Sequence, residues 1–189
     1  MTLTKSAVTR QAILDAARNA FARKGYSGTQ IRDITEGVPV TRANFYYYFK
    51  DKQQLFVELG TETYRETRSI IDQFGALPHR PALTELADWV RAYYVYLDHN
   101  GAFLMRSMED SPDDPAFKRS VMQLHRRTAR ALGDHLAARS SRPTSSAVAT
   151  GMIVMAMLER SWFLAHNAQT MTAEAAVCAC AETLQRLLA

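Results

Sequence analysis

The chain has 189 residues, with 23 Lys and Arg against 19 Asp and Glu, and 47% of its residues are hydrophobic, which is typical of a folded globular protein. No apolar run reaches the roughly 18 residues of a membrane span, and no apolar segment precedes a cleavage site near the N-terminus, so neither a membrane protein nor a secreted precursor is predicted. Cys178 and Cys180 lie two apart in a helical pattern and do not face each other, which favours free thiols and a cytoplasmic location.

The positive charge is concentrated in the first third of the chain. Residues 1–52 hold nine Lys and Arg against four Asp and Glu, whereas residues 53–189 hold 14 against 15. Such asymmetry favours a polyanionic partner for the first segment. A basic surface without a partner is the alternative, and charge alone does not decide between the two.

Helical periodicity begins at once and continues along nearly the whole chain. A first helix is predicted from Thr9, a plausible N-cap, to Gly25, which suits the left-handed position after a helix. Thr29 is predicted to cap a short second helix, in which Ile31 and Ile34 face inward. Pro39 then breaks the pattern because it lacks an N–H donor.

Thr41 is predicted to cap a third helix that runs through Phe49 in the segment TRANFYYYF. The run NFYYYF is also rich in residues that favour strands, but a lone strand in a helical chain would have no partner, so a helix is preferred. Asp51 and Gln54 have the spacing of a capping box for a fourth helix, which runs toward Phe74.

Longer helical patterns follow, with Asp114 and Pro115 as the start of one of them and Thr172 as the start of the last. The expected fold is therefore all-α. It consists of an N-terminal three-helix helix-turn-helix domain, residues 1–52, and a C-terminal helical bundle, residues 53–189.

The row of tyrosines in the third predicted helix suggests what the first domain does. Phe45 and Phe49 are four apart and can pack inward together, so Tyr46 and Tyr47 lie elsewhere on the helix. Exposed tyrosines on the second helix of a helix-turn-helix can offer hydroxyls to phosphates and rings to thymine methyl groups in the major groove.

The segment ILDAARNAFARKGYSGTQIRDITEGVPVTRANFYYYFKDKQQLF resembles the DNA-binding domain of the tetracycline-repressor-like (TetR) family of bacterial regulators. The resemblance covers roughly residues 9–60 and rests on F-x-x-x-G-Y, T-x-I-x-D-I and Y-x-Y-F-x-x-K. The chain departs from the family at Pro39 and Ala43, where glycine is frequent.

By position, the resemblance implies DNA contacts from nine residues: Thr29, Thr41, Arg42, Ala43, Asn44, Tyr46, Tyr47, Tyr48 and Lys52. For Tyr48, the alternative is that its ring packs inward. For Asn44, the alternative is that it satisfies unpaired backbone groups in the first turn of the helix. The family also implies a homodimer through residues 146–166 and 172–188, with small residues such as Gly151 allowing close helix approach; an intrachain core is the alternative.

The family further implies a small-molecule pocket among the central helices. Candidate lining residues are Trp89, Tyr93, Phe103, Met108 and Met122, with His125 as a polar group. Methionine and aromatic side chains suit an adaptable apolar cavity, although such residues at helical spacing are more often plain core.

The sequence therefore predicts a dimeric, ligand-responsive regulator, most often a repressor in this family, that binds a near-palindromic double-stranded DNA operator and is released by an apolar or amphipathic effector. An enzyme is disfavoured because neither an HExxH nor a nucleophile-elbow pattern occurs, and we expect no metal and no cofactor. An architectural, sequence-indifferent DNA-binding protein is disfavoured because the last 137 residues are slightly acidic.

Overall fold

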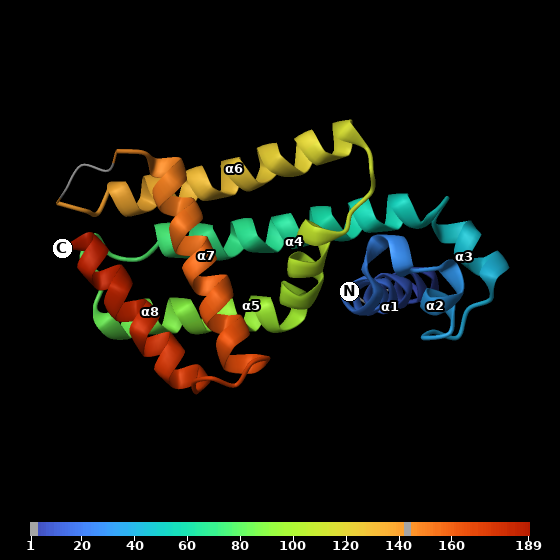
Figure 1. The fold of residues 1–189 in the computed structure, drawn as a ribbon, viewed down its shortest axis with the longest axis horizontal. Helices are drawn as coiled ribbons and strands as arrows, with labels where there is room; N and C mark the ends of the chain where they lie inside the picture. Colours follow the sequence, from blue (N-terminus) through green and yellow to red (C-terminus); the bar gives the residue numbers. More distant parts are fainter. Residues whose placement is uncertain (1–3, 142–144) are drawn as a thin grey trace. The chain divides into compact units, whose positions relative to one another are not determined.

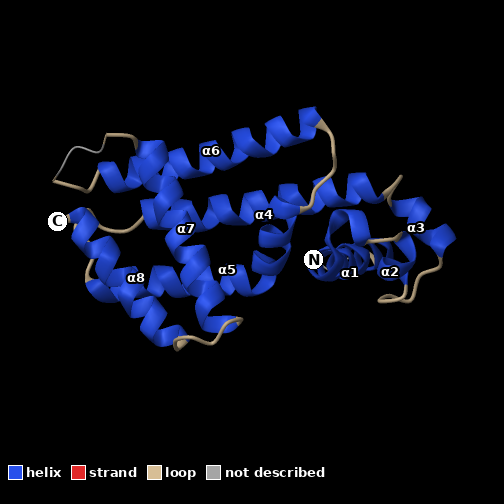
Figure 2. Ribbon diagram, in the orientation of Figure 1, coloured by secondary structure: helices blue, strands red, loops and turns tan. Residues whose placement is uncertain are grey.

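The computed structural model describes residues 4–141 and 145–189, and within them all regular structure is helical (Figures 1 and 2). The predicted all-α fold is therefore confirmed. The helices are α1 (Lys5–Gly28), α2 (Ile31–Thr35), α3 (Arg42–Tyr48), α4 (Lys52–Gly75), α5 (Leu83–Glu109), α6 (Pro115–Ala137), α7 (Ala147–His166) and α8 (Ala173–Leu188).

The chain forms two compact units, and each contains two separate segments. We call Met1–Thr63 together with Asn100–Lys118 the N-terminal unit, and Tyr64–His99 together with Arg119–Ala189 the C-terminal unit. Helices α4, α5 and α6 each contribute residues to both units. The predicted functional boundary after residue 52 stays a prediction.

In the N-terminal unit, short local sequence signals determine where most helices begin and end. Thr41 caps α3, since its hydroxyl accepts a hydrogen bond from the Asn44 N–H at 3.2 Å. Gly25 has φ +73° and interrupts the regular geometry of α1, as its predicted left-handed conformation requires. Two predicted caps are wrong by position: Thr4 rather than Thr9 caps α1, and Gln30 rather than Thr29 precedes α2.

One apolar core holds α1 to α4 together with the end of α5. Its fully buried members include Leu14, Phe21, Ile34, Phe45 and Phe49, none of which is more than 1% exposed. Burying a side chain of this size stabilises the fold by about 1.5–3 kcal/mol. The short α2 and α3, which are too short to be stable alone, are therefore positioned by this shared core.

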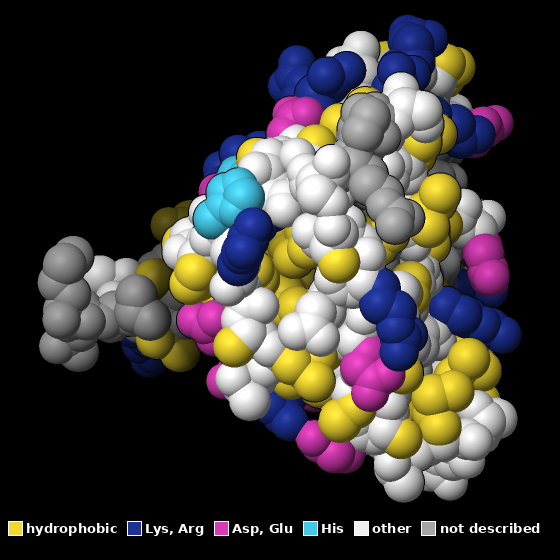
Figure 3. Space-filling model, turned by 90° about the vertical axis from the view of Figure 1, so that its left-hand side faces the viewer, with side chains coloured by type: hydrophobic (Ala, Val, Ile, Leu, Met, Phe, Trp, Pro, Cys, Tyr) yellow, Lys and Arg dark blue, Asp and Glu magenta, His cyan; other side chains and the backbone are white. Residues whose placement is uncertain are grey.

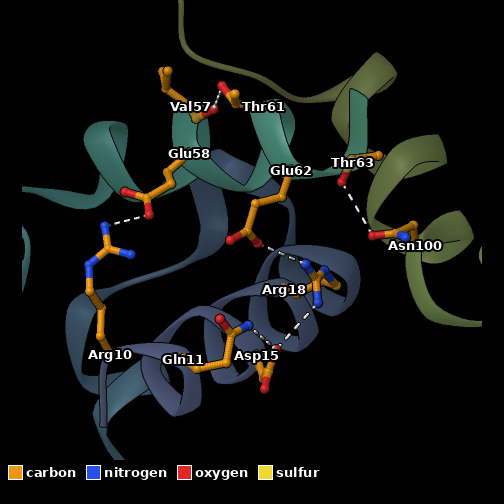
Figure 4. Close-up of polar contacts among 10 residues, drawn as sticks. All are labelled: Arg10, Gln11, Asp15, Arg18, Val57, Glu58, Thr61, Glu62, Thr63 and Asn100. Atoms are coloured by element: carbon orange, nitrogen blue, oxygen red, sulfur yellow. Dashed lines mark hydrogen bonds and ion pairs between the residues drawn. The ribbon is translucent and has the colours of Figure 1, made fainter. Parts of the chain in front are cut away.

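Ion pairs fix α1 against α4 within the N-terminal unit (Figure 4). Arg10 pairs with Glu58, and the buried guanidinium of Arg18 lies 3.3 Å from the carboxylates of both Asp15 and Glu62. Because Arg18 is only 4% exposed, loss of either carboxylate would leave a buried charge less well compensated.

In the C-terminal unit, α6 and α7 cross closely at two glycines. A Cβ atom added at Gly151 would meet the backbone oxygen of Ala129, and one added at Gly133 would meet that of Ala147, well inside contact distance. Gly151 therefore allows close packing within the chain, which is the alternative that the sequence left open for this residue.

The other faces of α7 and α8 are exposed. On α7 these residues include Ala149, Ile153 and Ala156, and Ile153 is 70% exposed. By length and composition alone α7 is apolar enough to cross a membrane, but a single such helix is weak support for a membrane span. Figure 3 shows one face of the molecule, on which hydrophobic side chains gather between Lys and Arg side chains.

Candidate nucleic-acid interface

Helix α3 presents a buried face and an exposed face, as the sequence predicted. Phe45 and Phe49 are buried on one side, with ring centroids 5.8 Å apart. On the other side, Tyr47 is 80% exposed and Tyr46 is 47% exposed, and the guanidinium of Arg42 lies 5.9 Å from the Tyr46 ring centroid. The exposed face thus combines a cation with two rigid phenols, which are groups that contact phosphates and base edges.

Most of the other predicted contact residues lie near this face. Thr41, Ala43 and Asn44 are exposed at the N-terminal end of α3. The N-terminal end of a helix favours anions because its first N–H groups lack intrahelical partners. Tyr48 is half-buried against the core, with its ring 5.0 Å from that of Tyr47.

The side chains of Thr29 and Lys52 do not lie on this exposed face. They form hydrogen bonds with backbone carbonyls around the turn between α1 and α2. Thr29 is 1% exposed, and its hydroxyl donates to the Gly25 carbonyl at 2.6 Å. The Lys52 ammonium donates to the carbonyls of Tyr26 and Thr29 at 2.6 and 2.9 Å and lies 4.4 Å from the Tyr26 ring centroid. Burial lowers the pKa of Lys52, whereas the charge of Asp110 raises it.

A carboxylate holds the same turn from another side. Asp110, which follows α5, accepts hydrogen bonds from the N–H and hydroxyl of Ser27 at 3.0 and 2.7 Å. These bonds lower the pKa of Asp110. The carboxylate lies so close to Gly25 that any Cβ there would collide with it. The turn that leads into α2 is therefore fixed between a cation on its carbonyls and an anion on its N–H group.

Residues 13–59 match the family model described as bacterial regulatory proteins, tetR family. The chain carries the DNA-binding domain of the TetR family. The resemblance predicted from the sequence motifs is thus confirmed.

Relatives with a named regulatory role match part of the chain. The chain is 33% identical over 72 residues to the HTH-type transcriptional repressor AcnR of Corynebacterium diphtheriae, which is 38% of either chain. It is 45% identical over 51 residues to the HTH-type transcriptional regulator AcrR of Shigella flexneri, covering 27% of this chain and 24% of AcrR. The matches therefore span well under half the length of these relatives.

Solved structures extend the likeness in fold to both units. A putative fatty acid metabolism regulator of Clostridium perfringens superposes with a TM-score of 0.73 at 17% identity, covering 94% of this chain and 96% of that one. The TetR-family regulator PfmR of Thermus thermophilus gives 0.71 at 18% identity, covering 92% and 97%. At such identities the likeness establishes the helical architecture alone.

Replacing Lys52 by alanine is expected to destabilise the TetR-family domain. The change leaves two backbone carbonyls without their charged donor, and hydrogen bonds to charged groups contribute about 1.5–3 kcal/mol each. Because Lys52 is partly exposed and water can replace it, we expect a loss of about 1–2 kcal/mol in urea unfolding.

Lys50→Ala, which removes an exposed lysine two residues away, is the matched control and should stay within about 0.5 kcal/mol of the wild type. The salt dependence of DNA binding tests the other role predicted for Lys52. A slope reduced by about one per subunit in Lys52→Ala, without loss of stability, would instead place its charge at a phosphate.

The predicted effector-binding residues do not gather at one place in either unit. Trp89 and Tyr93 are buried in the C-terminal unit, where Met122 is 59% exposed and His125 is half-buried. Burial lowers the pKa of His125. The other two members, Phe103 and Met108, belong to the N-terminal unit.

Phe103 packs into the core beneath the DNA-binding helices, with its ring centroid 5.3 Å from that of Phe56. Met108 is 61% exposed. These residues share helical spacing with Trp89 and Tyr93 but not their surroundings, because α5 passes from one unit into the other near Asn100. Periodicity along a helix cannot reveal such a passage.

A surface pocket opens elsewhere in the C-terminal unit, beside the end of α8. Its volume is about 340 Å³, and none of the predicted effector-binding residues lines it. The lining includes Arg80, Arg139, Gln185 and Leu188. Arg139 is committed to structure, since its guanidinium donates to the carbonyls of Gly75 and Leu77, both at 2.7 Å.

The sequence patterns did not single out Glu159, a half-buried acid on α7. One carboxylate oxygen of Glu159 is buried without a hydrogen-bond partner, and no ion pair of this residue is found within residues 4–141 and 145–189. Burial raises the pKa of Glu159 from 4.5 to about 7. The signal in the sequence was a glutamate in the otherwise apolar run MIVMAMLERSWFLA.

Glu159→Gln is expected to stabilise the protein at alkaline pH and not at acidic pH. With a folded pKa of about 7 and an unfolded pKa of 4.5, the folded state holds a proton that the unfolded state has lost between these values. The free energy of unfolding of the wild type therefore falls as pH rises through this window. The neutral variant lacks this contribution to the pH dependence. At 1.36 kcal/mol per pKa unit, the advantage of the variant should reach about 3 kcal/mol at pH 8 and vanish below pH 4.5.

Urea unfolding of both proteins between pH 4.5 and 8 measures this difference directly. Glu182→Gln, at an exposed acid on α8, is the control and should show no comparable trend. A stability difference that does not change with pH would show that Glu159 is ionised normally in the folded protein.

Proposed function

We propose that the protein is a transcriptional regulator, most simply a repressor, that binds a near-palindromic operator as a homodimer and is released by a small molecule. The observation that carries the proposal is the two-sided α3 in a TetR-family domain, with Phe45 and Phe49 buried while Arg42, Tyr46 and Tyr47 face solvent. A helix of this kind enters the major groove with its exposed face toward the bases.

In this proposal, the residues at and after the start of α3 contact DNA directly: Thr41, Arg42, Ala43, Asn44, Tyr46 and Tyr47, with Tyr48 beside them. Thr29 and Lys52 act by holding the turn that positions α2. Support for repression comes from AcnR, a relative over 72 residues that is named as a repressor. A regulator of bacterial genes works in the cytoplasm, where the chromosome lies.

Dimerisation through α7 and α8 is part of the proposal. Both helices carry exposed small or apolar residues at intervals of three or four, namely Ala149, Ile153 and Ala156 on α7, and Ala175 and Ala179 on α8. Small residues at this spacing allow helices of two subunits to approach closely. A two-fold dimer presents two copies of α3, so the operator should contain two half-sites in inverted repeat.

Selection of bound fragments from random and genomic DNA tests the function. We expect an inverted repeat, preferred over unrelated duplex by roughly a thousandfold or more at physiological salt. Equal affinity for all sequences would favour an architectural DNA-binding protein, and recovery of a single unrepeated half-site would contradict the dimer. The genes beside the recovered sites would identify what is regulated.

A further inference from the structure

Among the described residues of the C-terminal unit, buried side-chain polar atoms without a hydrogen-bond partner occur on Tyr93, Glu159 and His135, whereas other buried polar groups are satisfied. The Trp89 indole N–H donates to the Ile70 carbonyl at 2.8 Å, and the Trp162 indole N–H donates to the Asp98 carboxylate at 2.8 Å. The hydroxyl of Tyr93 is an exception, since it is fully buried and has no hydrogen-bond partner among the residues that the structure describes. An unpaired buried polar group is costly and calls for a physical reason.

Glu159 is the second exception, and it lies within electrostatic reach of the first. Its charge, after burial, is a cause of the strongly raised pKa of Tyr93. A phenol from α5 and a carboxylate from α7 with one unpartnered oxygen therefore act on each other without a hydrogen bond between them. A protonated amine in contact with both could donate an N–H to each oxygen, and its charge would compensate the carboxylate.

Aromatic rings surround the phenol. The ring centroid of Tyr93 lies 5.6 Å from those of both Trp89 and Tyr96, and Phe74 extends the cluster with its centroid 4.8 Å from that of Trp89. Aromatic faces attract organic cations, and tryptophan does so best. An anionic ligand would instead be repelled by the ionised form of Glu159, which a cation beside it favours.

We propose that Glu159 and Tyr93 form the recognition site for an organic cation, an amine or quaternary ammonium ion with an apolar body, whose charge pairs with the carboxylate while its body contacts the aromatic cluster of Phe74, Trp89, Tyr93 and Tyr96. This site would define the chemical class of the effector. That the cation regulates DNA binding rests on the proposed function. The binding itself does not depend on that function.

The position of Tyr93 gives a physical route from this site to the DNA-binding domain. Helix α5 continues without a break from Tyr93 to Glu109, and Asp110 follows and holds Ser27 at the turn before α2. A cation that draws α5 and α7 together at Tyr93 and Glu159 acts on the helix that Asp110 follows in the chain. Release of DNA follows if the cation binds more tightly to the arrangement that does not fit the operator.

The test uses the full chain and a panel of benzylammonium, benzyltrimethylammonium and tetraethylammonium chlorides, with benzyl alcohol as a neutral comparison. Calorimetric titration and thermal unfolding should show binding of at least one cation and not of the alcohol. Glu159→Gln should weaken binding roughly tenfold or more while remaining folded, because it removes a charge that costs stability. Glu182→Gln, an exposed acid that pairs with Arg186 at 3.1 Å, should bind like the wild type.

Failure of every cation to bind, or equal binding by wild type and Glu159→Gln, would overturn the proposed site. Operator affinity, measured on the same proteins without any cation, tests the regulator function separately. The bound cation should lower operator affinity in the wild type and in Glu182→Gln but not in Glu159→Gln. Binding with unchanged operator affinity would overturn the assignment of the cation as effector.

Discussion

Gly151→Ala is expected to destabilise the protein by about 3 kcal/mol or more. The added methyl group points at the backbone oxygen of Ala129, and backbone atoms of a packed helix cannot move aside as a flexible side chain can. Helices α6 and α7 must therefore separate at their closest point. The gain of about 0.5–1 kcal/mol that alanine normally brings to a helix interior is much smaller than this cost.

Gly60→Ala is the matched control because Gly60 is also within a helix, but an added Cβ meets nothing within 4 Å. This variant should be as stable as the wild type or more stable by up to about 1 kcal/mol. Urea unfolding followed by circular dichroism measures both variants. If Gly151→Ala and Gly60→Ala change stability alike, the close crossing of α6 and α7 is absent in solution.

The features predicted best from sequence were helix ends and buried helix faces, which depend on residues close together in the chain. Thr41 and the alternation of Phe45 and Phe49 with the exposed tyrosines specify where α3 begins and which side is buried, so the start and the buried side of α3 were predicted. A threonine elsewhere is less informative. Thr9 lies inside α1, where its hydroxyl bonds to the Lys5 carbonyl, because Thr4 offers an equally good cap one turn earlier.

Contacts between distant segments were beyond the reach of such reasoning. Nothing in the sequence around Asp110 indicates its partner, yet its carboxylate holds Ser27, 83 residues away. The sequence predicts that Lys52 contacts DNA, whereas its partners in the structure are backbone carbonyls. Every residue has a backbone carbonyl, so residue types cannot reveal such a partner. The unpaired state of Glu159 likewise depends on what the rest of the fold fails to place beside it.

Phe45→Ala is expected to abolish operator binding, and Tyr47→Ala, two residues further along α3, is expected to weaken it. The two variants act for different physical reasons. Phe45 has no exposed surface, and truncating a buried phenylalanine costs about 3–5 kcal/mol of stability. Because the short α3 depends on the core for its position, operator binding should be lost together with the cooperative unfolding of the TetR-family domain.

Tyr47 is 80% exposed, so its truncation should change stability by no more than about 0.5 kcal/mol. Loss of a base-edge contact nevertheless costs about 1–3 kcal/mol per site, which lowers operator affinity by roughly five- to 150-fold. Tyr47→Phe separates the two parts of this contact, because it keeps the ring and removes the hydroxyl.

Fluorescence anisotropy with the selected operator, together with urea unfolding of each variant, distinguishes the two effects. The expected pattern is a stability loss for Phe45→Ala and an affinity loss at full stability for Tyr47→Ala, with altered preference at one operator position. A fully folded Tyr47→Ala protein with wild-type affinity would remove this tyrosine from the interface. A dimer that binds normally without the Phe45 ring would refute the larger claim that the core beneath α3 positions it for DNA.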